Sequence, residues 1–180
     1  MGAMESERGN APPARAAHFR KLGISERLAA QATAPELLEK AANADEAVEV
    51  LAPELLGAAL WRVFKTPDGG RAVIHKDWLR HIVGQESDGI RDARERFAKF
   101  ILPTLKDPDE IWLVGGRKRL VKMFASGKGS KPKPMLLVLE NLADDFLLWT
   151  AYRTRAREIN KQRTGTLLYS RELAVRNKDG

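Results

Sequence analysis

Cysteine is absent from the 180-residue sequence, and its absence excludes disulfide bonds, thiolate catalysis and thiolate-based zinc sites. Histidine is scarce as well. His18, His75 and His81 are the three present, and no two of them stand at a zinc-binding spacing. We therefore expect no metal site and no cofactor. A chain without disulfides also fits a reducing cytoplasm.

Long apolar runs are missing too. None approaches the roughly 18 residues that a membrane helix needs, and Met1 to Gly9 lacks the basic region and apolar stretch of a secretory signal. We therefore expect no membrane partner. The opening Met1–Met4 resembles the remnant of an expression tag. Residues 1–17, rich in alanine, proline and charge, are expected to form a flexible arm.

Charge is unevenly distributed along the chain. Six Lys/Arg stand against nine Asp/Glu up to Leu60, whereas 25 stand against 15 from Trp61 onward. The net charge of +7 therefore belongs to the C-terminal two-thirds. A concentration of positive charge in one region favours a polyanionic partner there.

The apolar pattern divides the chain into two parts. Residues 18–60 are alanine-rich and predict short helices that begin near Ser25, Thr33 and Ala44. Residues 61–175 predict an α+β domain. Its expected strands are 61–66, 71–75, 110–114, 119–124, 135–139, 146–152 and 165–169, and its expected helices are 77–83, one running from about 88 to 101, and 153–163.

His81 is the first candidate for chemistry. It follows Asp77, a potential helix cap, by four residues on a short predicted helix. Histidine is well suited to general acid–base catalysis near neutral pH. The structural alternative is a half-buried helix histidine that makes one hydrogen bond.

Arg91 and Arg94 are the second candidates. They are spaced to share one face of the predicted helix, and neither has an acid four residues away. Arg96 and Lys99 do have such acids, and they are expected to form ion pairs on the helix surface. Arg91 and Arg94 are therefore the better phosphate-binding candidates, although a solvated helix face explains either of them equally well.

Thr150 and Tyr152 are out of place in an otherwise apolar strand. Side chains alternate along a strand, so both should point to one face, with Trp149 and Ala151 on the other. A polar pair on that face indicates either a floor for a ligand or an ordinary exposed sheet surface.

Cations surround these candidates. Residues 117–139 hold seven Lys/Arg and no acid, and Arg153, Arg155, Arg157, Lys161 and Arg163 follow Tyr152, opposed only by Glu158. Basic runs beside aromatic residues favour a phosphodiester backbone and unstacked bases, as in single-stranded RNA. Lys122 and Arg163 are the candidate substrate contacts in these runs, and Tyr169, which follows them, is a further candidate.

Several stretches together resemble the phage-associated branch of the barnase/EndoU/colicin/RelE-like nucleases. They are the run from Asp77 to Ile82, Arg94 with Phe97, the run from Ile101 to Trp112, Trp149 to Tyr152, and Arg163 to Tyr169. The run ending in Glu110-Ile111-Trp112 is the most specific. The resemblance implies helices followed by a small antiparallel sheet of about four strands, with the active site on the sheet face.

The resemblance further implies an endoribonuclease that needs no metal and leaves 2′,3′-cyclic phosphate ends. His81, Arg94, Thr150 and Tyr152 would be catalytic, and Arg91, Lys122, Arg163 and Tyr169 would bind substrate. It implies a toxin-like protein of phage or prophage origin, placed in the bacterial cytoplasm or on a phage particle. Its partners would be RNA, such as tRNA, and an immunity protein or a phage structural protein. A non-catalytic RNA-binding module and an accessory domain of a phage head-morphogenesis protein are the alternatives.

Overall fold

The computed structural model describes residues 13–84, 86–87, 90–127 and 129–179, and it describes side chains from residue 16 onward except at 86, 87, 90 and 91. The expected tag remnant lies outside these ranges. Helix α1 (Pro13–Leu22) occupies the end of the expected flexible arm. No helix in the described ranges is long and apolar enough to cross a membrane.

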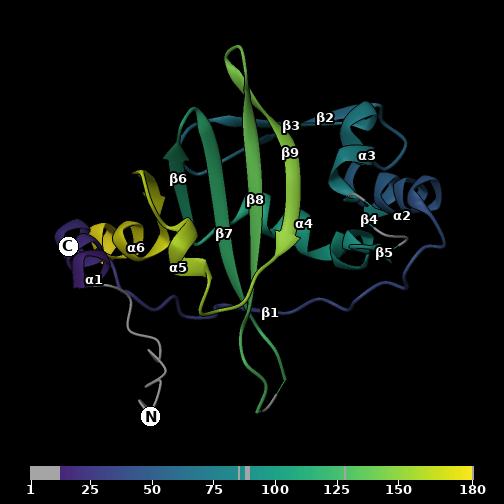
Figure 1. Cartoon of the computed structure of the whole chain (residues 1–180). Coiled ribbons are helices and arrows are strands. Elements are labelled where there is room, and N and C mark those ends of the chain that lie inside the picture. The colour runs from purple at the N-terminus through teal and green to yellow at the C-terminus, as the bar shows by residue number, and fades with distance from the viewer. Residues whose placement is uncertain (1–12, 85, 88–89, 128, 180) are drawn as a thin grey trace, which may run out of the picture.

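The fold is α+β, and its main sheet is large. Eight strands form one mixed sheet in the order β10-β6-β7-β8-β9-β3-β2, with β1 beside β7 (Figure 1). Their bounds are β1 Ala32–Thr33, β2 Trp61–Lys65, β3 Arg71–His75, β6 Glu110–Val114, β7 Arg117–Ala125, β8 Lys133–Leu142, β9 Asp145–Arg153 and β10 Thr166–Ser170.

The expectation of about four antiparallel strands is therefore wrong in size. Strands β6 to β9 do form an antiparallel meander of four. The sheet grows beyond them because β10 pairs with β6, because β3 and β1 join β9 and β7 in parallel, and because β2 pairs with β3. Parallel pairings connect segments far apart in the chain, so local hydrophobic periodicity does not reveal them.

Three helices cover one face of the sheet and form the main core. They are α2 (Ala44–Leu56), α3 (Leu79–Ile82) and α4 (Ala98–Lys106). Leu51, Leu79 and Phe100 of these helices join Leu120 and Leu137 of the sheet in one buried cluster. The strand 135–139 is buried along its whole length, as the unbroken apolar run predicts.

The opposite face carries a smaller core. Val121, Leu136 and Val138 pack there against Ile159 of the short helix α5 (Ile159–Gln162), and Tyr152 borders this cluster. Helix α6 (Arg171–Asp179) follows β10 and lies beside α1 (Figure 1). The helix expected over 153–163 is thus reduced to a single turn.

Two other helix predictions are wrong. No helix begins at Ser25 or Thr33, because this segment runs extended, Ala32 and Thr33 pair with β7, and Ala34 N donates to Ala125 O over 2.8 Å. The helix near Ala44 is confirmed, with Asn43 as its N-cap.

The helix expected to begin near residue 88 starts later. A small hairpin, β4 (Glu86–Ser87) and β5 (Ile90–Arg91), precedes it. The one-turn helix η2 (Arg94–Phe97) then leads into α4. On the other side of the hairpin, η1 (Lys76–Trp78) leads into α3, and His75 rather than Asp77 caps η1 by accepting from Asp77 N. These short elements bring the segment that contains His81 and the segment that contains Arg94 to β9, which lies far from both in the sequence.

Candidate functional site

A β-bulge in β9 prepares the candidate site. Leu148 pairs with Leu139, but the next pair is Thr150 with Val138, so Trp149 is the extra residue. Leu148 and Ala151 consequently both enter the main core. Thr150 and Tyr152 share a face as predicted, since their partners Val138 and Leu136 belong to one cluster. Trp149 does not simply alternate with them, because the bulge re-aims its side chain.

His81 stacks against this bulge. Its ring centroid lies 4.2 Å from that of Trp149, and Trp78 meets His81 edge-on at 6.3 Å. The two indoles are themselves in contact at 4.8 Å. His81 is exposed. The aromatic contacts therefore fix one side of the imidazole while leaving the ring accessible to a ligand.

Arg94 contacts the next residues of the same strand. Its Nη1 donates to Thr150 Oγ1 over 2.7 Å, and its Cζ lies 5.6 Å from the ring centroid of Tyr152. Asp92 accepts from Nη2 at 3.1 Å. Between them, Ala93 has a φ of 52°, the left-handed conformation that turns the chain from β5 into η2. A guanidinium held at two nitrogens is a pre-oriented anion binder.

A pocket opens at this point. Its volume is about 360 Å³, and Asp92, Arg94, Phe97, Tyr152 and Arg153 line it. His81 does not line this pocket; it contacts Trp149, the residue before Thr150. Along β9, a fixed cation, a hydroxyl and a phenol thus lie in contact, and an accessible imidazole lies against the adjacent Trp149.

Gly84, which follows α3, permits the close approach of Arg94. Its φ is +86°, and a Cβ placed there would lie 3.1 Å from both Arg94 Nε and Asp92 Oδ2. Glycine therefore meets two requirements at once, a left-handed turn after α3 and the close approach of the Asp92–Arg94 pair. This turn holds the His81 helix beside the arginine.

The remaining candidates from the sequence lie away from this site, or their side chains lie outside the described part of the structure. Arg91 falls in β5, and its side chain lies outside the described part of the structure. It cannot share a helix face with Arg94, because the two residues lie in different elements. Tyr169 lies in β10, separated from β9 by three strands, a distance of roughly 19 Å at the usual strand spacing.

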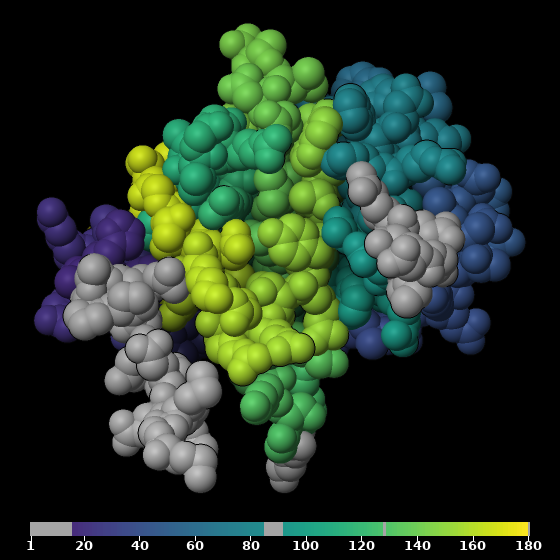
Figure 2. Space-filling view, viewed as in Figure 1, coloured from purple at the N-terminus to yellow at the C-terminus, as the bar shows by residue number. Residues whose placement is uncertain are grey.

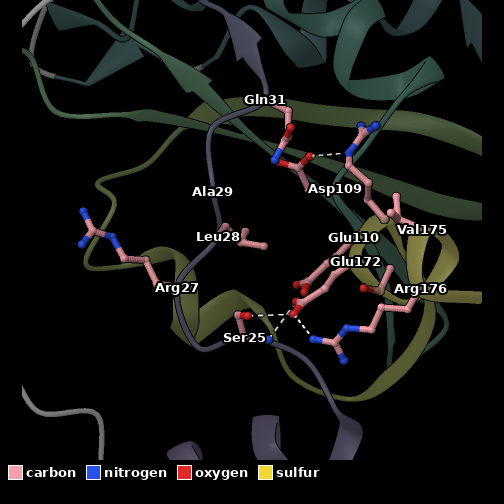
Figure 3. Close-up of a pocket in the computed structure, with 12 residues that line it drawn as sticks. Ser25, Arg27, Leu28, Ala29, Gln31, Asp109, Glu110, Glu172, Val175 and Arg176 are labelled. Carbon is pink, nitrogen blue, oxygen red and sulfur yellow. Dashed lines mark hydrogen bonds and ion pairs between the residues drawn. The ribbon is translucent and has the colours of Figure 1, made fainter. Parts of the chain in front are cut away.

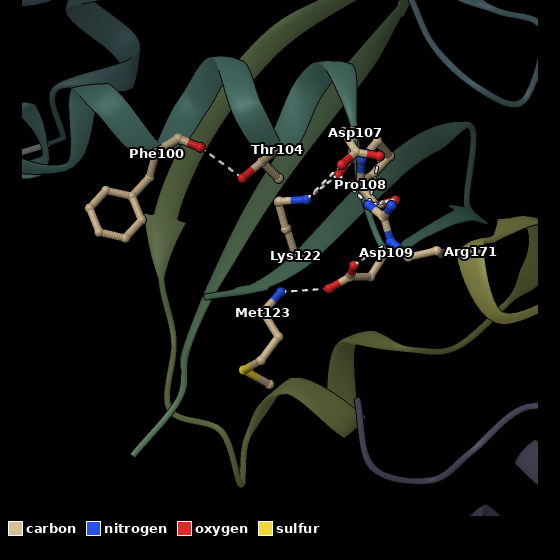
Figure 4. Close-up of polar contacts among 8 residues, drawn as sticks. All are labelled: Phe100, Thr104, Asp107, Pro108, Asp109, Lys122, Met123 and Arg171. Carbon is tan, nitrogen blue, oxygen red and sulfur yellow. Dashed lines mark hydrogen bonds and ion pairs between the residues drawn. The ribbon is translucent and has the colours of Figure 1, made fainter. Parts of the chain in front are cut away.

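Lys122 is a structural lysine. Its side chain is 2% exposed, and Nζ donates to the carbonyl and the carboxylate of Asp107, at 2.6 and 3.1 Å (Figure 4). Burial raises the pKa of Asp107, but hydrogen bonds from Arg171 and Lys122 outweigh it and bring the pKa below its ordinary value. The lysine therefore anchors the start of β6, and its amino group is not exposed to a substrate.

Arg163 is fully buried. Its five N–H groups all have partners: Glu110 takes two, and the carbonyls of Ser25 and Glu26 and the side chain of Asn160 take the others. No donor remains for a phosphate. The substrate-binding prediction for Arg163 and for Lys122 is therefore corrected to a role in holding the fold.

Four residues of the site were absent from the sequence-based set of site candidates: Trp78, Trp149, Asp92 and Arg153. Asp92 is the acid four residues before Arg96, with which a helix-surface pair was expected, but it pairs with Arg94 instead. The hydrophobic periodicity gave no sign of the bulge at Trp149. The one signal in the sequence for these residues was that aromatic residues and a cation stand close together in the run 149–153.

A second pocket, of about 440 Å³, lies between the N-terminal segment and α6 (Figure 3). Its three acidic and three basic side chains balance in charge. Glu172 accepts from the backbone and hydroxyl of Ser25 and pairs with Arg176, and Arg171 pairs with Asp109 at 3.0 Å. These contacts attach the N-terminal segment to the C-terminal helix, and we assign the pocket no chemistry. Within the described ranges, no group of three His, Asp or Glu side chains is arranged to hold a metal ion.

Fold and site together define a basic α+β domain with a pocket, lined by Arg94 and Arg153, beside a central strand. A family model described as phage-Barnase-EndoU-ColicinE5/D-RelE like nuclease2 matches residues 50–170. The match covers more than half of the chain and includes His81, Arg94, Thr150 and Tyr152, so the chain belongs to this family of phage-type nucleases. No curated protein and no solved structure matches the chain.

Proposed function

We propose that this domain is a ribonuclease that uses the RNA 2′-hydroxyl as its nucleophile and works without a metal ion. The observation that supports it best is the contact of Arg94 with Thr150 and Tyr152 on β9, with His81 against the next residue of that strand. Arg94 is fixed on Thr150 and Tyr152, and His81 is stacked on the adjacent Trp149. This set supplies a cation for the phosphate and a group for proton transfer.

Arg94 binds the scissile phosphate in this proposal. Its side chain is 27% exposed, and its partner Asp92 is 54% exposed. A phosphate oxygen entering the pocket would replace the Asp92 carboxylate on Nη2, while the Thr150 contact keeps the guanidinium in position. Charge builds up on the equatorial oxygens in the transition state, so a cation fixed beforehand stabilises that state more than the substrate.

His81 moves the proton. Its imidazole accepts the proton of the 2′-hydroxyl, and the 2′-oxygen forms a bond to phosphorus. The bond from phosphorus to the 5′-oxygen breaks, and that oxygen takes up a proton, for which the Tyr152 phenol is a candidate donor. The products are a 2′,3′-cyclic phosphate and a free 5′-hydroxyl. DNA lacks the attacking group and would remain intact.

The test uses total tRNA and a 2′-deoxy oligonucleotide in EDTA, with analysis of the new RNA ends. We expect cyclic phosphate ends from RNA only. His81→Gln should lower the rate by about 100-fold or more. Arg80→Gln is the matched control, because Arg80 is the exposed neighbour of His81 and pairs with Asp45 at the surface.

Several results would overturn the proposal. New ends that carry a 3′-hydroxyl, or cleavage that EDTA abolishes, would show a different chemistry. Binding of RNA without cleavage by the wild-type protein would favour the non-catalytic RNA-binding module instead. If the protein neither binds nor cleaves RNA, a role in the phage particle becomes the hypothesis to test.

A further inference from the structure

A basic groove lies beside the candidate site. It is formed by the loop between β7 and β8 and by the segment that follows β9, which lie side by side in Figure 2. Its volume is about 730 Å³. Five of its lining residues are cations and none is an acid: Lys131, Lys133, Arg153, Arg155 and Arg157.

These cations are poorly neutralised by the protein. Among the described residues, one ion pair involves the groove, a contact of 3.9 Å between Arg157 and Glu158, and both side chains are solvent-accessible. Glu158 has a closer partner in Lys161, at 2.6 Å. The groove therefore retains a strong positive charge, in contrast to the balanced pocket beside α6.

Arg153 connects the groove to the candidate site. It lines both the groove and the pocket that holds Arg94 and Tyr152. Its guanidinium stacks on Phe97 with Cζ 4.9 Å from the ring centroid, and its buried Nε has no hydrogen-bond partner in the described part of the chain. Burial lowers the pKa of Arg153. A partly desolvated cation at the junction of two pockets would be stabilised by an anion that enters either of them.

We propose that the basic groove binds the phosphates of single-stranded RNA that flank the scissile bond, with Arg153 at the junction. This inference rests on the proposed function for the position of the scissile phosphate. The domain would then need a substrate longer than a dinucleotide for full affinity. The flanking strand would leave the site along the segment 153–157 and cross the β7–β8 loop.

Single-stranded RNA is the occupant that the groove favours. Cations alternate with Pro132, Pro134 and Ala156 along its walls, and this alternation offers contacts to phosphates and apolar surface to sugars and bases. The prolines also restrict the backbone of one wall, so less conformational freedom is lost on binding. No long helix lines the groove, and a helix is the element that commonly enters the major groove of duplex DNA.

The experiment measures binding of a labelled single-stranded RNA of about 12 nucleotides to protein that carries His81→Gln, so that the RNA stays intact. Lys131→Glu combined with Arg155→Glu should weaken binding roughly tenfold or more. It should also lower the slope of log affinity against log salt by about 1.4, because each phosphate contact on a single strand contributes about 0.7. The matched control is Lys40→Glu with Lys65→Glu, an identical charge change at two exposed lysines outside the groove.

A second measurement separates this inference from the proposed function. In otherwise wild-type protein, the groove variant should raise KM for the long RNA while leaving cleavage of a dinucleotide unchanged. Equal binding by both double variants, or an unchanged salt slope, would overturn the groove proposal even if cleavage is observed. If no RNA is cleaved but the groove variant alone loses affinity and slope, the groove proposal stands and the proposed reaction fails.

Discussion

Arg94 and Thr150 join the two halves of the candidate site. The guanidinium Nη1 of Arg94 donates to Thr150 Oγ1 over 2.7 Å, and this bond connects η2 to β9 across 56 residues of sequence. The hydroxyl is an uncharged acceptor, so the positive charge of the arginine remains available to a ligand. This bond therefore orients the cation without neutralising it, whereas the contact with Asp92 orients the cation and also neutralises its charge.

Thr150→Val should separate orientation from charge. Valine keeps the shape of threonine but removes the acceptor, so Arg94 loses one anchor and retains its charge. A hydrogen bond to a charged group contributes about 1.5–3 kcal/mol, so kcat on RNA should fall roughly tenfold or more. Thr166→Val, at an exposed position of β10, is the control and should leave kcat unchanged. An equal loss in both variants would indicate a general effect on the sheet.

Gly84 and Gly69 allow a matched comparison. Both have left-handed backbones, with φ of +86° and +87°, but a Cβ at Gly69 meets nothing within 4 Å, whereas one at Gly84 crowds Arg94. Each alanine variant should lose about 1 kcal/mol of stability from backbone strain. Gly84→Ala alone should also lose RNA cleavage. Urea unfolding and initial rates measure the two effects. Unchanged cleavage in Gly84→Ala would show that the position of Arg94 is not critical.

Arg163→Ala should act on stability rather than on the reaction. It leaves Glu110, of which 2% of the side chain is exposed, buried without its cation. Loss of one member of a buried pair costs about 3–5 kcal/mol. We expect a large drop in the free energy of unfolding by urea, with cleavage per folded molecule retained at low temperature. A selective rise in KM with normal stability would instead return Arg163 to the substrate site.

Asp68 should make stability depend on pH. It is 4% exposed and accepts from Lys118 Nζ at 2.6 Å. Burial raises its pKa, but hydrogen bonds from Lys118 and Thr66 outweigh that effect and lower the pKa below its ordinary value of 3.8. A carboxyl with a lowered folded-state pKa stabilises the fold above its ordinary pKa, and this contribution is lost as pH falls through the lowered value.

Asp68→Asn should therefore cost roughly 3 kcal/mol at pH 7. The difference from wild type should shrink as pH falls below about 4. Urea unfolding at several pH values measures it. Asp145→Asn is the control, because its partner Arg71 is 57% exposed, and exposed pairs contribute at most about 1 kcal/mol. A pH-independent difference at Asp68 would contradict the ion-pair explanation.

The sequence predicted most of the strands but not their assembly. The runs at 61–66, 71–75 and 110–114 were found because they alternate or end at turn residues. The extended segment near Thr33 was mistaken for a helix, since its stability comes from pairing with β7 and not from local preference. The hairpin at 86–91 was missed for a similar reason, because the charged run 91–99 has helical spacing of its own.

The candidate site was predictable in part. His81, Arg94, Thr150 and Tyr152 stood out by residue type, and the structure brings them to the end of one strand. Arg163 and Lys122 stood out equally by charge, yet they are buried. Charge alone cannot distinguish a cation that meets a ligand from one that meets a carboxylate such as Glu110 or Asp107. That distinction depends on contacts between distant segments.

The partners of Arg163 have a practical consequence for anyone who trims this protein. The family match begins at residue 50, but two of the acceptors of Arg163 are the carbonyls of Ser25 and Glu26. A fragment that begins at the family boundary would lack two acceptors of the buried Arg163, and it would also lack β1, which pairs with β7. Such a fragment should expose apolar surface and aggregate, so expression trials of the domain should retain residues from α1 onward.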